Sequence, residues 1–124
     1  MSASAQIRSH RDLIVWQKAM DLVEAVYQTT ASFPKSETYA LTSQIRRAVV
    51  SIPANIAEGQ GRRLTKEYLY FLANARGSLL ELDTHLEIAL RLKYLSREQY
   101  SQLRGQLNEV AKILRFNARS GAWF

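Results

Sequence analysis

Apolar residues recur every three or four positions in four separate segments of this 124-residue chain, and that spacing most constrains its fold. Such intervals place side chains on one face of a helix, whereas a strand needs an alternation of two, which no segment shows convincingly. The third segment has the longest series: Tyr68, Leu72, Ala75, Leu79, Leu82, Leu86 and Ala89. Because the breaks are short, consecutive helices should be antiparallel. The spacing predicts one all-α domain over residues 1–124, an antiparallel up-down-up-down four-helix bundle.

Residues between the segments predict where each helix begins and ends. Phe33-Pro34 ends the first helix, because the residue before a proline disfavours helical angles. Gly59 is suited to close the second helix in a left-handed conformation, and Thr65 is the predicted N-cap of the third. Ser96 and Gln99 match a capping box that begins the fourth helix. The predicted helices span about 12–31, 35–59, 65–93 and 96–119.

The second helix carries a proline inside its apolar pattern. Pro53 lacks an N–H group and crowds the carbonyl of Val49, which normally costs about 3 kcal/mol in a helix interior. The helical spacing nevertheless continues to Ile56. We therefore expect Pro53 to lie within or beside a kinked second helix, with Ser51 or Asn55 bonding the freed backbone group.

The first two helices carry more small and apolar surface than one bundle core needs. The first helix has one apolar row at Leu13, Trp16, Met20, Val23, Tyr27 and Thr30, and a second row beside it at Val15, Ala19, Leu22 and Val26. Together they are wider than the ~100° stripe of an ordinary surface helix. The second helix has small side chains opposite its core face, at Ser43, Val50, Ala54 and Ala57. We predict a homo-oligomer whose subunit interface uses the second row and these small residues; an ordinary alanine-rich surface is the alternative.

Few residues suit catalysis or metal binding. There is no cysteine, so neither a disulfide nor a thiolate metal site can form. Only His10 and His85 are histidines, and Leu82 stands where a helical Glu-x-x-His metal motif needs its glutamate. Gly59-Gln60-Gly61 lacks the preceding strand and the Lys-Ser/Thr pair of a phosphate loop. We predict a surface His85, no catalytic residue, no metal, no cofactor and no small-molecule substrate; the protein is expected not to be an enzyme.

The chain shows neither a membrane span nor a targeting segment. No apolar run approaches the ~20 residues that cross a bilayer. The N-terminal residues lack the apolar stretch of a secretory signal. We therefore expect a cytoplasmic protein with no membrane partner.

Positive charge is concentrated in short stretches of a chain whose formal net charge is +6 at pH 7. Arginine suits phosphate because its planar fork bonds two oxygens at once. The candidate nucleic-acid contacts are Arg46, Arg47, Arg62, Arg63 and Lys66, with the aromatic side chains expected to stay in the core. Alternatively, these cations pair with acids or solvate a helix. Either Arg62 or Arg63 is placed to compensate Glu58 at the end of the second helix.

Three runs of residues carry a family resemblance: Phe33-Pro34-Lys35, Leu41-Thr42-Ser43-Gln44-Ile45-Arg46-Arg47-Ala48 and Ser51-Ile52-Pro53-Ala54-Asn55-Ile56-Ala57-Glu58-Gly59. Leu13-Ile14-Val15-Trp16-Gln17-Lys18-Ala19 and Arg76-Gly77-Ser78-Leu79-Leu80-Glu81-Leu82 fit the same pattern. From Asp12 to Arg119 the chain resembles the four-helix-bundle proteins encoded within intervening sequences of 23S rRNA genes. One departure is Ala40, where the family often has glycine, so the start of the second helix is expected to differ here.

The resemblance implies a four-helix bundle that assembles as a ring-shaped homopentamer. Relatives of the family include the accessory variability proteins of diversity-generating retroelements, which work with a reverse transcriptase and its RNA. We therefore predict a non-enzymatic, self-associating basic bundle that binds structured RNA or DNA. An oligomeric protein-interaction scaffold without nucleic-acid contact is the alternative. The sequence leaves Trp123-Phe124 undecided among packing on its own bundle, docking on a neighbour and disorder.

Overall fold

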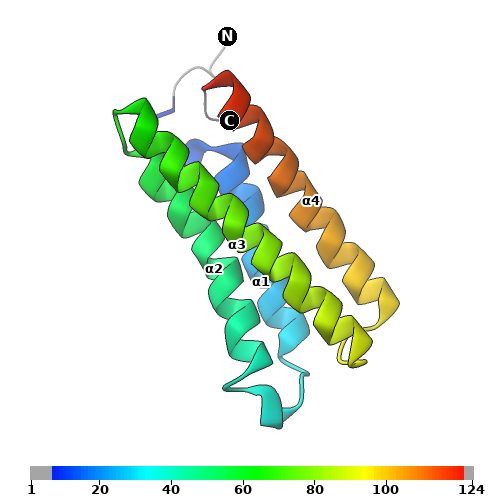
Figure 1. The fold of residues 1–124 in the computed structure, drawn as a ribbon. Coiled ribbons are helices and arrows are strands. Elements are labelled where there is room, and N and C mark those ends of the chain that lie inside the picture. Colours follow the sequence, from blue (N-terminus) through cyan, green and yellow to red (C-terminus); the bar gives the residue numbers. More distant parts are fainter. Residues whose placement is uncertain (1–6, 122–124) are drawn as a thin grey trace.

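Four helices make up most of the computed structural model, which describes residues 7–121. They are α1 (Ile14–Thr30), α2 (Leu41–Gln60), α3 (Thr65–Arg91) and α4 (Arg97–Ser120), with short 3-10 turns η2 (His10–Asp12) and η3 (Lys35–Glu37). Each helix packs against the next and α1 also packs against α4, so the four close into a bundle (Figure 1). No strand occurs among the described residues. The predicted all-α four-helix bundle is confirmed, while Trp123-Phe124 lies outside the described residues.

The second helix begins later than its sequence pattern predicts. Lys35–Glu37 form a separate 3-10 turn, and α2 starts only at Leu41. The Glu37 carboxylate holds this junction, because one oxygen accepts from the Leu41 N–H at 3.3 Å and the other from the Tyr94 hydroxyl at 2.9 Å. The turn is therefore attached to the connection between α3 and α4, which lies at the same end of the bundle, and it does not extend α2.

Three expectations for the rest of α2 have different outcomes. Pro53 does lie inside the helix, where it is buried. The Asn55 amide, however, donates to the Ser51 carbonyl at 2.8 Å and to the Ser51 hydroxyl at 3.0 Å, and not to the carbonyl that the proline frees. Gly59 does not close the helix in a left-handed conformation. It is helical and buried, and α2 continues to Gln60.

The third and fourth helices begin and end close to their predicted positions. The predicted N-cap Thr65 is instead the first residue of α3, preceded by Leu64 as N-cap. The capping box of α4 is confirmed, since the Ser96 hydroxyl accepts from the Gln99 N–H and the Gln99 side chain accepts from the Ser96 N–H. At the end of α4, Gly121 has a φ of 72°, a left-handed value that favours glycine.

The second apolar row of α1 lies in the core, and the first row is buried only at its ends, Leu13 and Thr30. Val15, Ala19, Leu22 and Val26, expected at a subunit interface, have exposed fractions of 0% and lie in the core of the single chain. Among the other row, Tyr27 is 40% exposed, and Trp16, Met20 and Val23 are half-buried. The placement of the second row at a surface interface is therefore wrong. The spacing could not decide which of two adjacent rows faces inward.

Candidate nucleic-acid interface

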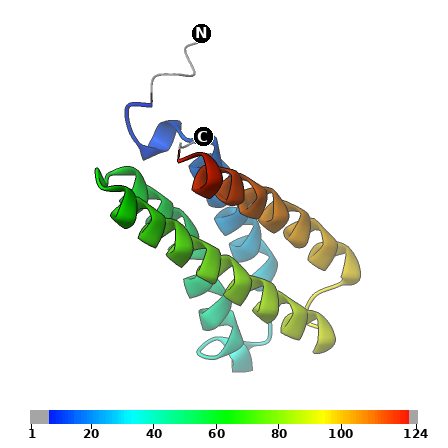
Figure 2. The ribbon, with the colours of Figure 1, turned by 45° about the horizontal axis from the view of Figure 1, so that its top comes forward.

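The topology of the bundle collects basic side chains at one end. Because α1 and α3 begin there while α2 and α4 end there, residues far apart in sequence meet at the end where both chain termini lie (Figures 1 and 2). The cations at this end, which we call the basic end, are Arg11, Arg62, Arg63, Lys66, Arg115 and Arg119. Three of them are predicted contact residues, and the other three come from η2 and α4.

One predicted contact residue at the basic end is occupied by an ion pair. The Arg62 guanidinium lies 2.8 Å from the Glu58 carboxylate and 4.9 Å above the centre of the Phe71 ring. Arg62 therefore compensates the acid in the last turn of α2, as one predicted alternative required. Arg63 and Lys66 are exposed and make no ion pair with any described residue. These two cations are therefore available to bind an external anion.

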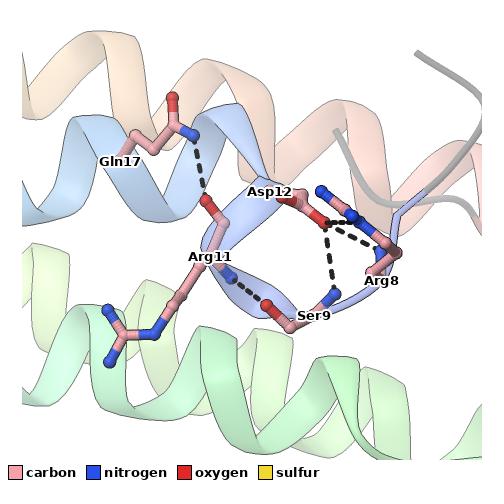
Figure 3. A network of polar contacts seen from close by, with 5 residues as sticks. All are labelled: Arg8, Ser9, Arg11, Asp12 and Gln17. Atoms are coloured by element: carbon pink, nitrogen blue, oxygen red, sulfur yellow. Dashed lines mark hydrogen bonds and ion pairs between the residues drawn. The ribbon is translucent and has the colours of Figure 1, made fainter. Parts of the chain in front are cut away.

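A polar network before α1 leaves the Arg11 side chain without an ion pair among the described residues, with its guanidinium 5.5 Å from the centre of the Trp16 ring (Figure 3). The Asp12 carboxylate accepts from the Arg8 N–H at 2.8 Å and from the Ser9 N–H at 3.4 Å, and pairs with the Arg8 guanidinium at 3.8 Å. The hydrogen bond from the Arg8 N–H is the main cause that lowers the Asp12 pKa. The Arg11 backbone bonds Ser9 and Gln17 at 3.2 and 2.9 Å, while its side chain points away from Asp12.

Arg46 and Arg47 stand apart from the basic end. Arg46 lies fourteen residues before Gln60, the last residue of α2, which is about 21 Å along the helix axis, and Arg62 follows beyond that end. The Arg46 guanidinium donates to the Thr30 hydroxyl at 2.9 Å and to the Tyr27 carbonyl at 3.3 Å, and it lies 4.4 Å from the Tyr27 ring centre. It therefore caps the end of α1, whereas Arg47 is exposed without an ion pair in residues 7–121. The five predicted contacts thus form two separate groups.

A hollow of about 680 Å³ lies beside Arg46 and Arg47 on the outer face of α1 and α2. We call it the α1–α2 hollow, and it is lined by Tyr27, Thr38, Tyr39, Thr42, Ser43, Arg46, Arg47, Val50 and Ser51. Sequence reasoning missed its aromatic residues, because aromatic side chains were expected to stay in the core. Tyr39 is 97% exposed, which corrects that expectation. The one sequence feature that could have indicated its exposure is its position between the turn after Pro34 and the start of α2 at Leu41.

The small residues of α2 lie at or near the surface. Val50 is 43% exposed, Ala54 is exposed, and Ser43 and Ala57 are half-buried. These residues are thus accessible to a neighbouring subunit, unlike the buried row of α1.

The acidic residues of α3 make structural ion pairs. Asp83 lies 2.9 Å from the Arg104 guanidinium, and Glu87 lies 2.9 Å from that of Arg91. His85 is half-buried, with an Nδ1 atom that has no hydrogen-bond partner, rather than being fully at the surface as predicted. Within residues 7–121 no group of three His, Asp or Glu side chains could hold a metal ion. None of the four helices, over that same range, is long and apolar enough to cross a membrane.

The family follows from a match to most of the chain. A family model described as 23S rRNA-intervening sequence protein matches residues 11–116, a range that includes α1, α2, α3 and most of α4. The chain belongs to this family. The predicted resemblance is confirmed, and the matched region includes the α1–α2 hollow and every named cation of the basic end except Arg119. No curated protein matches the chain.

A solved structure supports the same fold. It is the crystal structure, at 1.70 Å resolution, of a protein with unknown function from the S23 ribosomal protein family of Bacteroides thetaiotaomicron VPI-5482. The two chains are 24% identical and superpose with a TM-score of 0.77, covering 85% of this chain and 98% of the other. At this identity the likeness shows the fold alone.

Proposed function

We propose that this chain is a non-enzymatic, self-associating basic bundle of the cytoplasm that binds structured RNA or DNA through its basic end. The observation that carries the proposal is that Arg63 and Lys66 are exposed and unpaired at the end where Arg11, Arg115 and Arg119 also lie. Cations that are not neutralised by neighbouring acids give a surface its positive potential, which attracts a polyanion. Duplex nucleic acid carries a dense row of phosphates, and lysine or arginine side chains that neutralise them release bound counterions.

Self-association is the second part of the proposal. The small-residue face of α2 at Ala54 and Ala57 and the exposed Leu80 of α3 are unlike surfaces that lie outside the α1–α2 hollow. A ring forms when one patch meets a different patch on the next subunit and the rotation closes. The number of five subunits comes from the family resemblance. In a ring, the basic ends of several subunits would add their charges.

A protein-interaction scaffold is the competing function, and one observation favours it. The guanidinium groups of two candidate contact residues already bind groups of the same chain. That of Arg46 binds the end of α1, and that of Arg62 binds the Glu58 carboxylate. If neighbouring subunits bound Arg63 and Lys66 in the same way, no cation would remain for phosphate. The two functions then differ in whether the purified protein binds nucleic acid at all.

The test measures the affinity for a structured RNA and for duplex DNA over a range of salt concentrations. The double variant Arg63→Ala/Lys66→Ala removes two free cations and no ion pair, so it should fold normally. Its control is Lys35→Ala/Lys93→Ala, which removes the same charge at the opposite end of the bundle. We expect binding that weakens steeply with salt, by a logarithmic slope of about −0.9 per phosphate contact on duplex DNA. The slope should flatten in the first variant and hardly change in the control.

Light scattering tests assembly on the same samples. A mass several times 14.2 kDa supports self-association, and Ala54→Glu, at an exposed residue outside the hollow, should reduce it. A monomer at micromolar concentration would refute self-association. Absence of binding to either nucleic acid at low salt would favour the scaffold.

A further inference from the structure

The α1–α2 hollow presents aromatic surface to solvent. Tyr39 stands in the short connection between η3 and α2 with 97% of its surface exposed, and Tyr27 is 40% exposed on the last turn of α1. The Tyr39 ring therefore presents a flat apolar face that no residue from 7 to 121 covers. A flat ring at the edge of a hollow is the kind of surface on which a nucleobase stacks.

The Tyr27 ring is already extended by a guanidinium. Arg46 lies 4.4 Å from the ring centre and is held there by its bonds to the Thr30 hydroxyl and the Tyr27 carbonyl. Its orientation is thus fixed before any ligand arrives. Nucleobases stack on guanidinium planes as well as on aromatic rings, so this pair offers a second stacking platform in the hollow that Tyr39 also lines.

Thr42 contributes to the wall of the hollow but offers no accessible polar atom to it. The residue is only 8% exposed, and its Oγ1 atom is buried without a hydrogen-bond partner. The recognition of a ligand in the hollow therefore rests on the exposed rings and the arginines.

The charge of the hollow favours a polyanion. Arg46 and Arg47 both line it, Arg47 without an ion pair among the described residues, and no aspartate or glutamate is among the lining residues. A phosphate beside a stacked base would meet the free guanidinium of Arg47, which suits phosphate through its planar fork.

We propose that the α1–α2 hollow binds unpaired nucleotides of a nucleic-acid strand, with a base stacked on Tyr39 and its phosphate on Arg47. The inference rests on the proposed function, in that the ligand is a nucleic acid, and it specifies single-stranded segments for this second group of arginines. In a duplex the bases are stacked on each other and cannot reach the hollow. Structured RNA supplies both forms, a paired stem for the basic end and an unpaired loop for the hollow.

The experiment compares a labelled 12-nucleotide oligouridine with a 12-base-pair RNA duplex as probes. Tyr39→Ala should weaken binding of the single strand about five- to tenfold, because stacking on one aromatic ring has an effect of this size, and should leave duplex binding nearly unchanged. Arg47→Ala should weaken it and reduce its salt dependence. Tyr70→Ala is the matched control, since Tyr70 is 61% exposed but lies on α3 outside the hollow. Circular dichroism confirms the fold of each variant.

Three results would overturn the inference. If neither probe binds the wild type, the proposed function fails together with it. If the oligouridine binds but Tyr39→Ala binds it as tightly as the wild type does, only the assignment of the hollow fails. If Tyr39→Ala lowers the mass in light scattering and leaves both affinities unchanged, the hollow is a contact between copies of this chain.

Discussion

The hydroxyl of Tyr68 donates a 2.9 Å hydrogen bond to the backbone carbonyl of Asn117, joining the first turn of α3 to the last turns of α4. Both residues are buried, with exposed fractions of 7% and 0%. The same carbonyl also accepts from the Gly121 N–H at 2.9 Å. The Asn117 carbonyl, with its two donors, thus connects α3 to α4 at the basic end, where no loop joins these two helices.

Replacing Tyr68 with phenylalanine should lower the free energy of unfolding by about 1 kcal/mol, the usual net worth of one hydrogen bond. The loss stays modest because Gly121 still satisfies the carbonyl. Urea unfolding measures the change, with Tyr70→Phe as an exposed control expected to stay within about 0.5 kcal/mol. A loss above about 3 kcal/mol would show that the hydroxyl has a larger structural role than this bond.

Adjacent arginines on α2 should respond differently to the same change. Arg46→Ala removes the bonds that cap α1 and should destabilise the protein by about 2 kcal/mol, since the donor is charged. Arg47→Ala removes no described contact and should change stability by less than about 0.5 kcal/mol. Equal effects of the two variants in urea unfolding would contradict the assignment of Arg46 as a cap.

Stability should depend on the charge of Glu87 at acidic pH. Hydrogen bonds from the Arg91 guanidinium and then from the Tyr100 hydroxyl lower the pKa of Glu87 from its ordinary value of 4.5. A lowered pKa in the folded state stabilises the fold above the unfolded value, and the contribution disappears as the pH falls through the folded value.

The variant Glu87→Gln should therefore unfold at lower urea than the wild type at pH 7. The difference should shrink as the pH falls below 4.5. Glu24→Gln, at an exposed residue of α1 with no ion pair among the described residues, is the control. A difference that stays constant from pH 7 to pH 3 would rule out this electrostatic explanation.

Pro53→Ala should leave the fold intact and raise the free energy of unfolding by about 1 kcal/mol. A proline inside a helix costs about 3 kcal/mol, whereas losing the two buried ring methylenes costs about 1.6 kcal/mol. Urea unfolding gives the stability and light scattering the assembly. If stability changes little and the mass falls, the proline shapes a subunit contact; a large loss of stability would mean that its ring is essential to the core.

Local signals in the sequence predicted the helices well, and tertiary contacts decided what the sequence could not. The capping box at Ser96 depends on two nearby residues, so it was readable from spacing alone. The late start of α2 depends on Glu37 bonding Tyr94, 57 residues away, which no local pattern reveals. The roles of Arg46 and Arg47 differ for the same reason. Adjacent residues on a helix point about 100° apart, and only the position of α1 makes one of them a cap.

An even number of antiparallel helices leaves Ile7 and Gly121, the first and last described residues, at the same end of the bundle (Figure 1). An affinity tag or fluorescent protein attached at either terminus would therefore stand next to Arg63 and Lys66 and compete with any ligand there. The chain has no cysteine of its own. A single cysteine introduced at the exposed Lys35, at the opposite end, would accept a thiol-reactive dye at one defined position and leave the basic end unobstructed.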